Sequence, residues 1–169
     1  MEEENMIGVY DYTVILTYGN LIFGVMGILV SFTGNLSYSF LLLILAGICD
    51  MFDGVVAKTK KNRTWKEKNY GIQIDSLADL VSFCVLPTII GFVLECPMIF
   101  VYCFFILAGL IRLAHFNVKE LERCSTITNS RKYYEGLPVT STAIILPIIS
   151  AVCYFLHLEI ASILSASCT

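Results

Sequence analysis

Two neighbouring stretches of the chain carry pairs of aspartates inside sequence that is otherwise apolar enough to cross a membrane. Asp50 and Asp53 form the first pair, and Asp75 and Asp79 form the second. Residues three or four apart share one face of a helix, and an ionised carboxylate at membrane depth is costly unless a cation or a water-filled cavity meets it. We therefore expect two helices that turn these faces toward each other and form a cage for divalent cations.

The apolar segments define the fold class. Five of them approach the ~20 residues that a membrane helix requires: Tyr12 to Phe32, Leu36 to Ala57, Gly71 to Leu94, Met98 to Phe116, and Leu137 to Leu156. A composition that is 57% hydrophobic and 15% charged, with a mean hydropathy of +0.76, argues against a disordered chain and against an ordinary soluble globule. The sequence predicts an all-α, polytopic membrane helix bundle of five transmembrane helices, with residues 1–169 as one domain.

The basic residues and the last residues bear on topology. All 11 Lys and Arg residues fall in the links 58–70 and 117–136 or, for Arg112, close beside the second link. The positive-inside rule makes that side cytoplasmic, so we expect a multi-pass protein of the cell membrane whose acid pairs face the cytoplasm. Residues 157–169 are too short to span; they are expected to lie at the outer interface or to begin a truncated sixth helix. None of the seven cysteines forms a Cys-x-x-Cys pair, so the sequence does not support a zinc site.

The acid pairs also carry a family resemblance. The pattern Asp50-x-x-Asp53-Gly54-x-x-Ala57-Lys58, followed by Gly71-x-x-x-Asp75-x-x-x-Asp79, resembles the signature of the CDP-alcohol phosphotransferases. It departs from that signature in Lys58, where the family has arginine, and in a longer connector over residues 59–70. The segments 16–24, 75–83, 112–117 and 135–138 are similar to the phosphatidylserine synthases of bacteria and archaea, with His115 in place of a usual arginine.

The resemblance implies an activity. It is the transfer of the phosphatidyl group from CDP-diacylglycerol to the hydroxyl of L-serine, giving phosphatidylserine and CMP. The resemblance also implies a homodimer in the lipid bilayer with no nucleic-acid partner. It further implies two divalent cations, Mg²⁺ or Mn²⁺, held by Asp50, Asp53, Asp75 and Asp79, with Asp79 also as the catalytic base. The expected CDP-binding residues are Asn20, Asp53, Gly54, Ala57, Lys58, Gly71 and Asp75. Arg112, Asn117 and Arg131 are candidates for binding the acceptor or a phosphate.

Other interpretations remain open at the level of sequence. Within the family, the acceptor could be glycerol 3-phosphate or inositol phosphate, which would call for more basic residues around Arg112 and the 117–136 link. From a different class, the acids could line the path of a small cation or proton transporter, or the chain could be an inactive truncated remnant. Asn20 could be a polar helix-packing residue, and Arg112 an arginine that extends to the membrane interface. Asn117 and Arg131 could simply belong to the polar link.

Overall fold

Helices make up the part of the chain that the structure describes. The computed structural model describes residues 14–59, 64–94, 99–125, 139–149 and 152. Its elements are α1 (Ile15–Phe32), α2 (Leu36–Thr59), α3 (Trp65–Leu80), the π-helical segment η2 (Val81–Val85), α4 (Leu86–Val93), α5 (Ile99–Ser125) and the 3-10 turn η3 (Val139–Ser141), after which residues 142–149 are helical. These ranges contain no strand, which confirms the all-α class.

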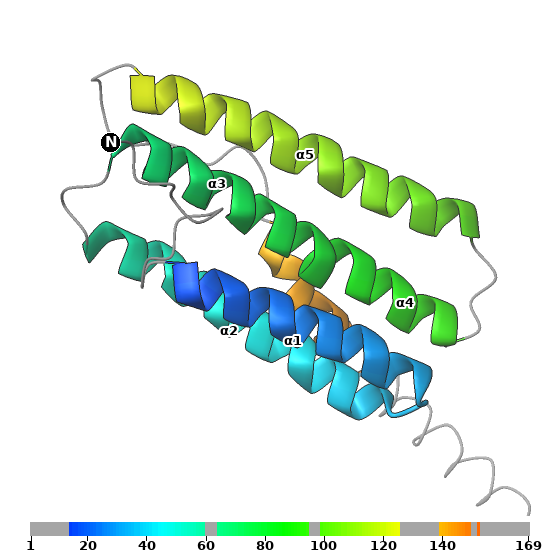
Figure 1. Ribbon diagram of the computed structural model, residues 1–169. Coiled ribbons are helices and arrows are strands. Elements are labelled where there is room, and N and C mark those ends of the chain that lie inside the picture. The colour runs from blue at the N-terminus through cyan, green and yellow to red at the C-terminus, as the bar shows by residue number, and fades with distance from the viewer. Residues whose placement is uncertain (1–13, 60–63, 95–98, 126–138, 150–151, 153–169) are drawn as a thin grey trace, which may run out of the picture.

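The helices pack in the order of a hairpin, a central rod and an outer helix. α1 and α2 form the hairpin, α3, η2 and α4 run on as one continuous rod, and α5 lies on the far side of that rod (Figure 1). Gly34 makes the tight turn between α1 and α2, with a φ of 82° that a residue without a side chain adopts at little cost. The rod therefore lies between the hairpin and α5, and it carries the second acid pair.

Four helices in the described ranges are long and apolar enough to cross a membrane. They are Ile15–Phe32, Leu36–Val56, Trp65–Val93 and Ile99–Glu122. Four of the five predicted spans thus have a helical counterpart. The predicted fifth span, Leu137 to Leu156, is described only at residues 139–149 and 152, and residues 157–169 lie outside the described part. The fifth and sixth segments therefore stay predictions.

Two predicted span boundaries were wrong. The third span was expected to begin at Gly71, but the helix begins at Trp65 because Thr64 and Glu67 form a capping box. The Thr64 Oγ1 accepts from the Glu67 amide at 3.2 Å, and the Glu67 carboxylate accepts from the Thr64 amide at 2.8 Å. The fourth span was expected to end at Phe116, whereas α5 continues to Ser125, since the Lys, Glu and Leu residues that follow are good helix formers.

The π-helical segment η2 follows from a proline. Pro87 has no amide hydrogen to donate to the carbonyl of Phe83, four residues earlier. In the structure the Phe83 carbonyl instead accepts from the Thr142 Oγ1 at 3.1 Å, and the Leu86 amide donates to the Val81 carbonyl, five residues back. Short π-helical turns inside α-helices often mark functional sites, and this one begins two residues after Asp79.

The core is small and lies where the hairpin meets the rod. Its buried members are Leu43, Ala46, Phe83, Leu86, Ile90 and Ala143. Gly24 and Gly27 of α1 allow the close approach, because a Cβ at Gly24 would lie 2.3 Å from the Ser82 Oγ and one at Gly27 would lie 2.7 Å from a Leu86 methyl carbon. Small residues at helix contacts are typical of membrane bundles. Large apolar side chains face outward, with Phe100 81% and Phe104 68% exposed, as a surface in contact with lipid requires.

Candidate active site

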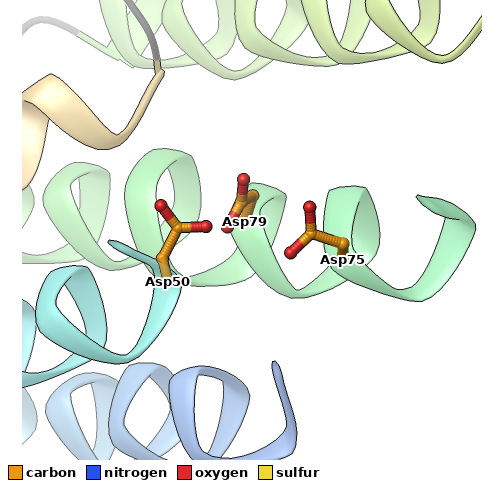
Figure 2. Close-up of side chains that lie close together, drawn as sticks. All are labelled: Asp50, Asp75 and Asp79. Atoms are coloured by element: carbon orange, nitrogen blue, oxygen red, sulfur yellow. The ribbon is translucent and has the colours of Figure 1, made fainter. Parts of the chain in front are cut away.

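Three carboxyl groups meet where α2 faces α3. Asp50 comes from α2, and Asp75 and Asp79 lie one turn apart on α3; one oxygen of each is within 4.8 Å of the others. Figure 2 shows the three side chains gathered between the two helices. Asp79 is buried, whereas Asp50 and Asp75 are partly exposed. The prediction that the two acid pairs face each other is therefore confirmed for these three residues.

The fourth aspartate lies at the edge of this group. Asp53 is one turn after Asp50 on α2 and is only 8% exposed. Its carboxylate contacts that of Asp75 and accepts a hydrogen bond from the Thr17 Oγ1 of α1 at 3.1 Å. Asp53 is thus next to the other three, although it is not one of the triplet whose oxygens lie closest together.

Helix α1 also reaches the group through Asn20. The Asn20 Nδ2 donates to the Asp79 Oδ1 at 3.0 Å, and the Ser82 Oγ donates to the backbone carbonyl of Asn20 at 3.1 Å. Asn20 and Ser82 are both 0% exposed, and Thr17 is 4% exposed. One helix therefore supplies a hydrogen-bond donor to a carboxylate of α2 and to a carboxylate of α3.

The chemistry of the cluster suits a hard divalent cation. No basic side chain in the described ranges forms an ion pair with these aspartates, and the Asp75 Oδ1 is buried without a hydrogen-bond partner. A buried carboxylate needs compensation by a charge or by donors, and a set made only of carboxylate oxygens is the kind that Mg²⁺ and Mn²⁺ prefer. The residues present therefore fit the predicted metal site.

The predicted nucleotide-binding residues are only partly described. Gly54 borders open space, because a Cβ there would meet no atom within 4 Å. Gly71 lies on α3 one turn before Asp75 and is partly buried. Ala57 and Lys58 belong to α2, but their side chains lie outside the described part of the structure. The open space beside Gly54 is thus on the same helix as Asp50 and Asp53.

Two of the three acceptor candidates, Asn117 and Arg112, lie in the described part of the chain. Asn117 of α5 accepts a hydrogen bond from the Ser76 Oγ of α3 at 2.6 Å, and both residues line a groove of about 280 Å³ between the two helices. Arg112 is exposed on α5, and Arg131 lies outside the described residues. Asn117 is therefore connected to the helix that carries Asp75 and Asp79.

Sequence reasoning missed Thr17, Ser76 and Ser82, which bind the aspartates or their neighbours. Thr17 had a readable signal, because it lies three residues before Asn20 in an otherwise apolar helix, and residues at that spacing share a face. Ser82 has the same signal, because it lies three residues after Asp79. Ser76 has none, since its partner Asn117 lies 41 positions away in the sequence.

Comparisons with known proteins identify the family of the chain. The family model described as CDP-alcohol phosphatidyltransferase matches residues 12–168. The chain is 43% identical over 105 residues to the CDP-diacylglycerol--serine O-phosphatidyltransferase of Saccharomyces cerevisiae, covering 59% of this chain and 36% of the yeast protein. It is 31% identical over 131 residues to the archaetidylserine synthase of Methanothermobacter thermautotrophicus, covering 72% of this chain and 49% of that protein.

A bacterial relative shows a similar degree of sequence identity. The CDP-diacylglycerol--serine O-phosphatidyltransferase of Helicobacter pylori strain J99 is 30% identical over 141 residues, which cover 80% of this chain and 55% of that protein. The chain therefore spans between a third and somewhat more than half of the length of these relatives. No solved structure matches the chain significantly.

Proposed function

The chain belongs to the CDP-alcohol phosphatidyltransferase family, and on this premise we propose that it makes phospholipid by transferring the phosphatidyl group of CDP-diacylglycerol to L-serine. The products are phosphatidylserine and CMP. The observation that carries the proposal is the meeting of Asp50, Asp75 and Asp79 between two membrane helices. The names of the yeast and Helicobacter relatives support serine as the acceptor rather than glycerol 3-phosphate or inositol phosphate.

The aspartates are proposed to hold two divalent cations, Mg²⁺ or Mn²⁺. Asp50, Asp75 and Asp79 would supply the oxygens that lie closest together, and Asp53 would complete the set from one turn along α2. When bound, the cations would neutralise charge on the diphosphate and on the leaving phosphate, which is the main requirement of phosphoryl transfer. The partnerless Asp75 Oδ1 supports this role.

Asp79 is proposed as the general base. Its Oδ1 accepts from Asn20, which orients the carboxylate that takes the proton from the serine hydroxyl. The serine oxygen then forms a bond to the phosphorus that carries diacylglycerol. The bond from that phosphorus to the bridging oxygen breaks, and the oxygen leaves with CMP. A positioned base of this kind contributes about 10²–10⁴-fold to a rate.

The remaining residues are proposed to place the substrates. Gly54 borders open space on the helix of Asp50 and Asp53, which supports a position for the cytidine diphosphate there, with Asn20, Ala57, Lys58 and Gly71 around it. Asn117 is proposed to act at the acceptor end, and Arg112 and Arg131 to bind carboxylate or phosphate groups. We further propose that the acid cluster opens toward the cytoplasm from the cell membrane, next to the basic 58–70 link, and that the protein works as a homodimer.

Turnover of CDP-diacylglycerol tests the proposal. Purified protein in detergent is given CDP-diacylglycerol and labelled serine with and without Mn²⁺, and CMP and labelled lipid are measured. Metal-dependent formation of both in equal amounts is expected. Asp79→Asn should reduce it by about 10²–10⁴-fold, whereas Glu67→Gln should leave it unchanged, since glutamine preserves the capping box. Release of CMP with glycerol 3-phosphate but not with serine would refute the proposed acceptor, and no release with either would refute the proposed activity.

A further inference from the structure

We propose that Thr17 and Asn20 of α1 are positioning residues, which orient Asp53 and Asp79 for cation binding without touching the cation. This inference rests on the proposed function only in that the acid cluster binds divalent cations. Thr17 donates to Asp53 on α2 at 3.1 Å, and Asn20 donates to Asp79 on α3 at 3.0 Å. Each donor thus holds one member of a different acid pair.

The burial of the two donors supports an indirect role. Asn20 is 0% exposed and Thr17 is 4% exposed, and the carboxylates that they bind are each 8% exposed. A carboxylate that is fixed through one oxygen turns its other oxygen in a defined direction, and such outer partners orient the ligands of protein metal sites. Asn20 fixes the Asp79 Oδ1 and Thr17 fixes the Asp53 Oδ2, so the second oxygen of each is left for the cluster.

The backbone of α1 is itself bound to the rod at Asn20. The Ser82 Oγ of η2 donates to the Asn20 carbonyl at 3.1 Å, so the side chain and the backbone of Asn20 are both bound to the rod. One turn further along α1, Gly24 packs against Ser82 with no room for a Cβ. These contacts set the depth and rotation of α1, and Thr17 lies one turn away from Asn20 on the same face. The two donors are therefore presented by a fixed element.

Another buried polar side chain of α1, that of Ser31, does not contact an aspartate. Ser31 is also fully buried, but its Oγ lies 2.8 Å from the carbonyl of Gly27 and 3.0 Å from the Ser39 Oγ, at the other end of the hairpin. That contact joins α1 to α2 far from the acids. It provides a matched control, because Ser39→Ala removes a buried side-chain hydrogen bond between the same two helices as Thr17→Val does.

Binding of Mn²⁺ to the purified protein, measured by electron paramagnetic resonance without substrate, tests the inference. We expect Thr17→Val and Asn20→Leu each to weaken Mn²⁺ binding by about 10–100-fold, the usual effect of losing an outer partner. Thr17→Ser, which keeps the hydroxyl, should bind like the wild type. Ser39→Ala should lower the thermal unfolding temperature and leave Mn²⁺ affinity unchanged.

The outcomes separate this inference from the proposed activity. Wild-type affinity in folded Thr17→Val and Asn20→Leu would overturn the positioning role, even if the protein releases CMP. Weakened binding that Thr17→Ser does not rescue would also overturn it, because the hydroxyl would then not be the cause. A wild type that binds Mn²⁺ but does not turn over CDP-diacylglycerol would refute the proposed reaction, while the affinities of the variants would still decide the role of α1.

Discussion

Replacing Gly24 by alanine should force α1 away from η2 and weaken both the fold and the acid cluster. The new Cβ would lie 2.3 Å from the Ser82 Oγ and 3.1 Å from the Ser82 Cα. Non-bonded carbon atoms prefer a separation of about 3.5–4.0 Å, so the two elements must move apart by roughly 0.5–1 Å. Overpacking of this kind costs about 1–3 kcal/mol.

The displacement of α1 from η2 should also lengthen the hydrogen bonds that connect α1 to Asp79. The Ser82 Oγ bonds the carbonyl of Asn20 at 3.1 Å, and the Asn20 Nδ2 bonds Asp79 at 3.0 Å. A displacement of roughly 0.5–1 Å stretches such contacts beyond the range of a good hydrogen bond. Gly24→Ala should therefore lower the rate of CMP release as well as the free energy of unfolding.

Thermal unfolding in detergent and CMP release are measured side by side on three variants. Gly24→Ala should lower both. Gly54→Ala is the control for stability, since its Cβ meets no atom within 4 Å and alanine favours a helix; its unfolding temperature should stay unchanged or rise. The double variant Gly24→Ala with Ser82→Gly removes the clashing hydroxyl and should recover part of the stability. Wild-type unfolding and turnover in Gly24→Ala would refute the reasoning.

Three further predictions concern the acids and the rod. Asp79→Asn should reduce CMP release by about 10²–10⁴-fold with the fold retained by circular dichroism; an active variant would remove Asp79 as the base. Chelation with EDTA should abolish release, and Mg²⁺ or Mn²⁺ should restore it, since the described cluster offers only carboxylate oxygens; activity that survives EDTA would contradict the metal site. Thr142→Val should cost about 0.6 kcal/mol, the mean for hydrogen bonds between membrane helices, because the Phe83 carbonyl loses its donor. Unfolding measured against Thr33→Val, which alters two exposed hydrogen bonds, checks this, and equal stability of the two variants would contradict it.

The acid cluster could be predicted because its geometry is mostly local. Asp75 and Asp79 share a helix face by spacing alone, and the cost of charge in an apolar segment requires that the face meet a partner. The start of α3 was missed for a different reason. Hydropathy locates the apolar part of a helix, whereas the capping box of Thr64 and Glu67 sets its first turn in polar sequence. That box can be read in the sequence, so the error was avoidable.

The hydrogen bonds around the cluster could not be predicted in the same way. Thr17 bonds Asp53 across 36 positions, and Asn20 bonds Asp79 across 59. Which face of α1 turns toward the acids depends on the contact of Gly24 with Ser82, a property of the packed bundle. The proline at 87 indicates a broken helical hydrogen bond, but nothing local identifies Thr142 as the donor that replaces it.

The link between Thr142 and Phe83 bears on the order in which the bundle assembles during synthesis. The acid-bearing rod leaves the ribosome well before residue 142, so its Phe83 carbonyl enters the bilayer without the hydroxyl that it later accepts from. A hydrogen bond of this kind between membrane helices contributes about 0.6 kcal/mol, so the rod can insert before this bond forms. Docking of residues 139–149 would then add the contact to a helix inserted earlier.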